Sequence, residues 1–155
     1  MSRLFLGACL CALITPSGAF AQSQHFDVRP LAEHLDEAGL EAVFSGGTFD
    51  GAYNFSDRGE ARSFYRETHN ANGTTRYREG DLDVPGAWAV DDDALCFTYN
   101  HPLLQGGCFR VYQVVNCFYF YSTSVPLMDN EIARDYWVAR AVRDGENARC
   151  EAAIS

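Results

Sequence analysis

The stretch WAVDDDALCFTYNHPLLQGGCFRVYQVVNCFYFY, residues 88–121, contains three runs rich in aromatic and β-branched residues. The runs are residues 94–100, 108–114 and 117–124, the last of which extends slightly past the stretch, and the segments HPLLQGG and VN separate them. Aromatic and β-branched residues favour strands, whereas Gly, Pro and Asn favour turns. Because short gaps join antiparallel neighbours, the stretch predicts three consecutive antiparallel strands.

The same pattern continues towards the N-terminus. Four further runs, TFDGAYNFS, ARSFYRETH, TTRYREG and GAWAV, occupy residues 48–56, 61–69, 74–80 and 86–90. The segments DRGE, NANG, DLDVP and DDD are interpreted as the turns between runs, and they leave no room for the crossover helices of a parallel sheet. We therefore predict a mainly β fold, an antiparallel meander that forms a small barrel or sandwich.

The segments on either side of the meander are less regular. Apolar residues recur at helical spacing over residues 30–44, which predicts a short N-terminal helix that Gly39 breaks into two pieces. Residues 125–135 are interpreted as a loop with a helical turn. Residues 136–145 fit a strand or a helix, and their valines favour the strand. We expect one domain over residues 29–155.

The first residues are typical of a cleaved export signal. Arg3 precedes an apolar run that ends at Ile14 and is too short to span a bilayer, and Ala-Phe-Ala follows as a cleavage site. We predict a signal peptide over residues 1–21, an exposed arm over residues 22–28, and a periplasmic or secreted protein without a membrane span. The charged start argues against a short buried helix, and the run before Cys9 is too short for a lipoprotein signal.

The mature chain is strongly acidic. Of 12 basic residues the signal removes Arg3, which leaves 11 against 21 acidic residues, a formal charge of −10, and every basic residue is arginine. Phosphate groups repel such a domain, so nucleic acids and anionic lipids are not expected partners. The acidity serves solubility, but it also suggests an inhibitor of a basic enzyme such as a lysozyme.

Four cysteines remain after removal of the signal: Cys96, Cys108, Cys117 and Cys150. Their gaps hold 11, 8 and 32 residues, none of which is the short gap of a zinc site. An even number in an exported chain predicts disulfides. A hairpin centred near Leu103 places Cys96 opposite Cys108, at a separation that suits a disulfide. Cys117 is then expected to pair with Cys150 and to tie the C-terminal tail to the sheet.

Several of these short motifs resemble a known family. Gly47-Thr48, Gly86-Ala87-Trp88, Leu95-Cys96 and Cys108-Phe109-Arg110-Val111 are similar to the pattern of the domain-of-unknown-function family numbered 995. The similarity covers roughly residues 38–122. Members of that family are small exported proteins of Gram-negative bacteria. The resemblance implies an exported β-domain, and it implies no activity.

The chain shows no local motif for catalysis, for a metal or for a cofactor. Its histidines are not spaced as metal ligands, and each is interpreted as a solvated loop or surface residue: His25, His34, His69 and His101. The three carboxylates of Asp91-Asp92-Asp93 are interpreted as a turn rather than as a cation site. We therefore predict that the protein is not an enzyme and holds no cofactor or metal.

The aromatic residues are the most suggestive feature. In CFYFY, Phe118 and Phe120 alternate with Tyr119 and Tyr121, so one face of the strand packs inside the barrel. A small barrel lined with aromatic rings either holds an apolar ligand or is filled by its own side chains. The short strands favour a filled interior.

Our first hypothesis is a non-catalytic, monomeric binding module of the bacterial envelope, with an apolar small molecule or a protein as its partner. The runner-up is a structural or stress-related envelope protein without a ligand. The candidate contact surface combines Arg110 and Tyr112, on one strand face, with Trp88 and Tyr99 nearby in the meander.

Overall fold

The computed structural model describes residues 27–54, 63–104, 106–124 and 137–150. The predicted signal peptide, most of the predicted arm and the predicted loop at 125–135 lie outside these residues. The elements are η1 Arg29–Leu31, β1 Glu33–His34, α1 Glu37–Phe44, β2 Thr48–Tyr53, β3 Phe64–His69, β4 Thr74–Glu79, β5 Leu82–Asp91, β6 Ala94–Tyr99, β7 Gly107–Val114, β8 Cys117–Ser122 and β9 Ala139–Arg143.

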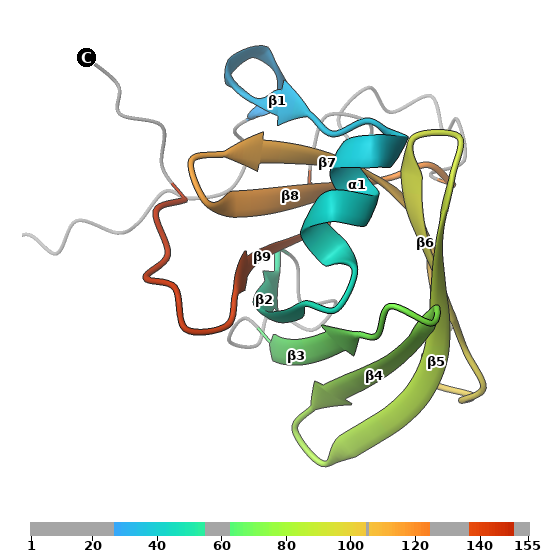
Figure 1. Cartoon of the computed structure of the whole chain (residues 1–155). Coiled ribbons are helices and arrows are strands. Elements are labelled where there is room, and N and C mark those ends of the chain that lie inside the picture. Colours follow the sequence, from blue (N-terminus) through green and yellow to red (C-terminus); the bar gives the residue numbers. More distant parts are fainter. Residues whose placement is uncertain (1–26, 55–62, 105, 125–136, 151–155) are drawn as a thin grey trace, which may run out of the picture.

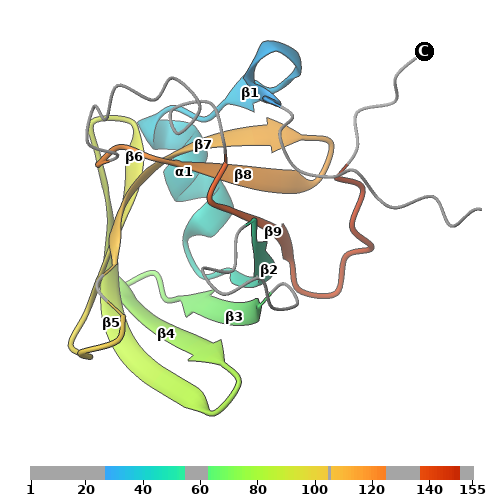
Figure 2. The same cartoon turned by 180° about the vertical axis from the view of Figure 1, so that it is seen from behind.

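Strands β2 to β9 form a closed antiparallel barrel of eight strands (Figure 1). Each strand pairs with the next along the chain, and β9 pairs with β2 to close the ring, with Gly51 opposite Ala141. The extra strand β1 pairs with β7 at Tyr112 and Gln113, beyond the part of β7 that pairs with β6 (Figure 2). The predicted mainly β meander is confirmed, and it forms a barrel rather than a sandwich.

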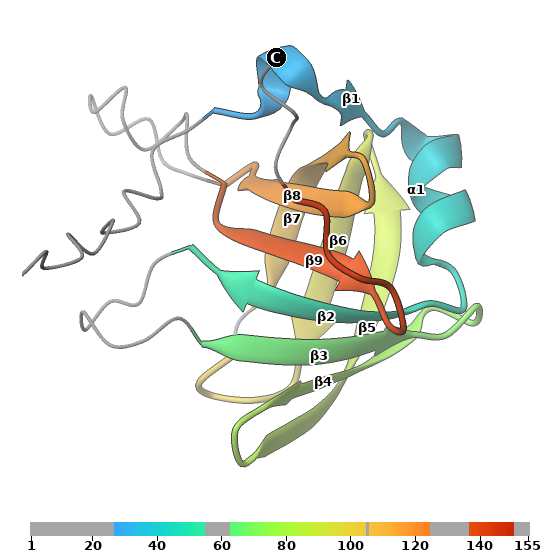
Figure 3. The same ribbon diagram turned by 90° about the vertical axis from the view of Figure 1, so that its left-hand side faces the viewer.

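Helix α1 lies at one end of the barrel, which is seen from the side in Figure 3. The Asp36 side chain caps the helix by accepting a hydrogen bond from the Gly39 backbone N–H at 2.8 Å. Leu40 and Phe44 are fully buried, and the Phe44 ring lies 4.7 Å from the Phe49 ring. The helix therefore closes this end with apolar side chains.

The predicted helix is wrong at its start. It begins at Glu37 instead of residue 30, and Gly39 lies in its first turn rather than at a break. His34, expected on the helix, lies on β1. Two carboxylates explain why the helix starts at Glu37. Asp36 accepts from the Gly39 N–H, and Asp93 accepts from the Glu37 N–H at 2.9 Å. Together they satisfy the first backbone donors of the helix.

Strand β5 is longer than predicted. The segment DLDVP, interpreted as a turn, instead contributes Leu82 to Pro85 to the strand. The reversal needs only Gly80 and Asp81, because Gly80 adopts a φ of +54° and Glu79 pairs directly with Leu82.

The predicted strand over residues 136–145 is present as β9, and the predicted turn at Asp92 is present with a φ of +49°.

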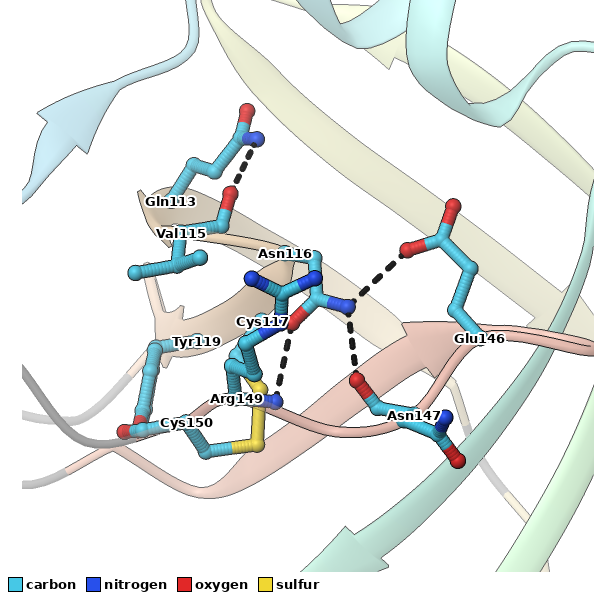
Figure 4. The surroundings of a disulfide bond; sticks show 9 residues. All are labelled: Gln113, Val115, Asn116, Cys117, Tyr119, Glu146, Asn147, Arg149 and Cys150. Atoms are coloured by element: carbon cyan, nitrogen blue, oxygen red, sulfur yellow. Dashed lines mark hydrogen bonds between the residues drawn. A yellow bond between two sulfur atoms is a disulfide. The ribbon is translucent and has the colours of Figure 1, made fainter.

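Two disulfides join the pairs that the sequence predicts. Cys96 and Cys108 lie opposite each other on β6 and β7, with their Cα atoms 4.0 Å apart. Cys117 on β8 pairs with Cys150 in the tail, at a Cα separation of 5.0 Å. Asn116 holds the same tail, because its side-chain carbonyl accepts from the Arg149 N–H at 2.9 Å (Figure 4).

A second apolar cluster lies outside the barrel, on the outer face of β8. Tyr119, Tyr121 and Trp137 are buried there together with Val28 and Cys117. Val28, expected in an exposed arm, is 5% exposed, because it packs into this cluster, against which Ala32 and Cys150 of the tail also pack. Among the described residues, no helix has the length and apolar character needed to cross a membrane.

Candidate ligand site

The barrel interior is packed at the helix end and hollow at the other. Near α1, apolar side chains such as Trp88, Leu95 and Val111 are buried in one cluster. A cavity of about 220 Å³ occupies the opposite part, bordered by Leu103 and Leu104 of the loop between β6 and β7. The sequence leaves open whether the barrel interior is filled by its own side chains or holds a ligand. In the structure one part of the interior is filled and the other part is hollow.

Small residues on β9 leave this space, and a glycine on β2 shapes its wall. Ala139 and Ala141 face the cavity from β9. Gly51, beside Ala141 on β2, is covered by the Tyr65 ring, and a Cβ atom at Gly51 would lie 2.2 Å from Tyr65 Cζ. The glycine therefore allows the Tyr65 ring to lie across β2, where it forms part of the cavity wall.

One carboxylate lines the cavity. The Glu67 side chain is 7% exposed, and its Oε1 accepts a hydrogen bond from the Tyr99 hydroxyl at 2.5 Å. The Thr75 hydroxyl also lies 2.8 Å from Oε1, and it shares its proton between this oxygen and the Thr68 carbonyl. Among the described residues, Oε2 accepts no hydrogen bond, and His69 Nε2 lies 3.6 Å away. Glu67 thus has one committed oxygen and one open oxygen.

His69 is enclosed by aromatic rings. It is 2% exposed, and its ring lies 5.3 Å from Phe97 and 5.4 Å from Phe49, with Phe44 and Trp88 also near. Neither ring nitrogen has a hydrogen-bond partner in the described part of the chain. The expectation of a solvated His69 is wrong, because β3 turns this residue into the barrel.

A row of tyrosines lines the cavity beside Glu67. Tyr53 and Tyr77 share a hydrogen bond of 2.9 Å, and the Tyr77 hydroxyl donates to Glu79 Oε2 at 2.6 Å. Burial raises the pKa of Tyr53 to about 12 and raises the pKa values of Tyr65, Tyr77 and Tyr99 above the ordinary 10.0. The four hydroxyls therefore stay protonated near neutral pH.

The four residues of the predicted contact surface do not share a surface. Trp88 is 5% exposed inside the barrel, where its indole N–H donates to the Asn70 carbonyl at 2.8 Å. Tyr99 also points inwards and lines the cavity. Arg110 and Tyr112 lie on the outer face, because they pair with Tyr121 and Tyr119, which belong to the outer cluster. Closure of the barrel separates the two pairs.

Glu67 and His69 were not recognised as site residues from the sequence, although the sequence contains a signal for them. In the run ARSFYRETH, Tyr65, Glu67 and His69 occupy alternate positions, so they share one face of a strand. A strand face that carries a glutamate and a histidine beside a tyrosine is usually exposed to solvent, so the sequence gives no reason to place it inside the barrel. The barrel instead buries that face, and Arg66 and Thr68 take the outer one.

No family model matches the chain, and comparisons with curated proteins and with solved structures also found no match. The resemblance to family 995 therefore stays a prediction. The cavity itself is accordingly the basis on which a function can be inferred.

Proposed function

We propose that this protein is an exported, non-catalytic binding module that holds a small, largely apolar molecule inside its barrel. The observation that supports this function is the cavity of about 220 Å³ with its wall of aromatic and small side chains. An engineered apolar cavity of about 150 Å³ is enough to bind benzene. The space here suits a molecule of one or two rings.

The structural alternative, an envelope protein without a ligand, is less favoured because it gives no reason for an unfilled interior. A well-packed core leaves few voids larger than a water molecule. Two disulfides support export, since such bonds persist in oxidising compartments.

Binding without catalysis is supported by the setting of His69. A general base must lie within hydrogen-bond reach of the proton that it removes. His69 lines the cavity, but both of its ring nitrogens are buried, and neither has a hydrogen-bond partner among the described residues. Glu67 lines the cavity, but its Oε1 already accepts a hydrogen bond from the Tyr99 hydroxyl.

The test is titration of the oxidised protein with toluene, indole and naphthalene by calorimetry, together with the shift in melting temperature that a bound ligand produces. Ala139→Leu fills part of the cavity and is expected to abolish binding while the protein stays folded. Ala87→Leu, at an exposed position on the outer face of β5, is the matched control and should bind normally. Absence of binding by all three compounds, or unchanged binding by Ala139→Leu, would contradict the proposal.

A further inference from the structure

The cavity has an unbalanced charge. Glu67 is the carboxylate among its described lining residues, and no arginine lines it within the described part of the chain. The chain contains no lysine, and its formal net charge is −9. A ligand carboxylate entering this space would meet the Glu67 carboxylate and no arginine, and the imidazole of His69, which also lines the cavity, already faces Glu67 at 3.6 Å. Bringing a second carboxylate next to Glu67 is costly in a site of low polarity. An anionic ligand such as a fatty acid is therefore disfavoured.

Most of the polar groups that line the cavity are open as hydrogen-bond acceptors, because their protons are already used. The Tyr99 proton is committed to Glu67, and the Tyr77 proton is committed to Glu79. Because Tyr77 donates to Glu79, Tyr53 is the donor in its hydrogen bond with Tyr77. The acceptors that remain open are the Oε2 atom of Glu67 and lone pairs on the tyrosine oxygens. Two groups can still donate a hydrogen bond: the Tyr65 hydroxyl and the imidazole of His69, whose ring nitrogens have no partner among the described residues. Such a site complements a ligand that donates hydrogen bonds.

The aromatic rings add an attraction for positive charge. Tyr53 and Tyr65 have their ring centroids 5.0 Å apart, Tyr65 and Tyr77 5.6 Å, and Tyr77 and Tyr99 5.7 Å. The four rings thus form a continuous wall beside Glu67. The faces of tyrosine rings attract ammonium groups, and aromatic walls of this kind recognise organic cations.

From these three observations we infer that the ligand is a small organic cation, an amine with an apolar ring whose ammonium group lies beside Glu67 against the tyrosine wall. This inference depends on the proposed binding function and specifies the class of its ligand. An ammonium group carries donors and no acceptor, which matches the open acceptors of the site. The ring of the ligand occupies the apolar part of the cavity, near Ala139 and Phe120.

The test compares three ligands of similar shape and different charge: 2-phenylethylamine, 2-phenylethanol and 3-phenylpropionate. At pH 7 and fixed ionic strength, calorimetry is expected to show about tenfold tighter binding of the amine than of the alcohol, and no binding of the carboxylate. Equal or tighter binding of the alcohol or the carboxylate overturns the inference and leaves the proposed function intact. If these ligands fail to bind and toluene, indole and naphthalene fail as well, the proposed function itself fails.

Glu67→Gln supplies the second measurement. This substitution removes the charge and keeps an oxygen that accepts from Tyr99, so the amine should lose about tenfold in affinity while the alcohol binds as before. Glu33→Gln, at an exposed position on β1, changes the net charge equally and should leave the amine unaffected. Unchanged amine binding by Glu67→Gln overturns the inference. If that variant does not fold, the ligand series with the natural protein still decides.

Discussion

His69 gives the sharpest prediction about stability, because the structure encloses its ring without satisfying it. Each buried polar group without a hydrogen bond costs about 1–3 kcal/mol, and His69 has two such nitrogens. Replacing it with phenylalanine removes both nitrogens and keeps the packing against Phe49 and Phe97. The larger ring adds a strain of about 1 kcal/mol or more in a well-packed interior. We expect His69→Phe to raise the free energy of unfolding by about 1–2 kcal/mol.

The assay is urea unfolding of the oxidised protein, followed by tryptophan fluorescence and analysed by linear extrapolation. Melting should move upwards by about 3–6 °C per kcal/mol for a domain of this size. The Glu67→Gln/His69→Phe double variant completes a cycle that measures the coupling between the two side chains. A loss of about 3 kcal/mol or more in His69→Phe would refute the reasoning, because it would mean that His69 is charged and paired with Glu67.

Three further predictions concern the second disulfide, the buried tyrosines and the cavity wall. Replacing Cys117 and Cys150 with serine should lower the free energy of unfolding by about 4 kcal/mol, the chain-entropy value for their separation of 33 residues, as measured by urea unfolding; a loss below about 1 kcal/mol would contradict it. Burial raises the pKa of Tyr53 from 10.0 to about 12, so the contribution of the protonated Tyr53 to the free energy of unfolding is complete below pH 10 and falls by about 1.4 kcal/mol per pH unit up to about pH 12. The free energy of unfolding, measured at pH 9, 10 and 11, should therefore decline less in Tyr53→Phe than in the natural protein. An equal decline in the two proteins would refute this. Gly51→Ala should displace the Tyr65 ring into the cavity, destabilise the fold by about 1–3 kcal/mol and weaken ligand binding, and the double variant with Tyr65→Ala should regain stability; a stable Gly51→Ala variant with normal binding would count against the described wall.

The strands and their disulfides were predictable because local patterns decide them. Alternation and turn residues mark β6, β7 and β8 within a few positions, since a strand needs only its own side chains to favour extended backbone. The pairing of Cys96 with Cys108 follows from a hairpin, whose two arms are close in sequence. The start of α1 was missed because Asp36 and Asp93 together cap it, and the second of these is distant in the chain.

What the sequence by itself determined is therefore which residues share a face of each strand. Only the tertiary structure decided which face points inwards, because closure between β2 and β9 sets that choice for the whole ring. The strand β8 illustrates the difficulty, since Cys117 to Tyr121 are all buried, one face by the barrel and the other by the outer cluster. The cavity was also unpredictable from the sequence. Its volume is the space that side chains from several different strands leave unfilled inside the barrel. Ala139 and Ala141 leave the volume open, and Gly51 gives the Tyr65 ring room to form the wall, only when the closed ring places β9 and β2 side by side.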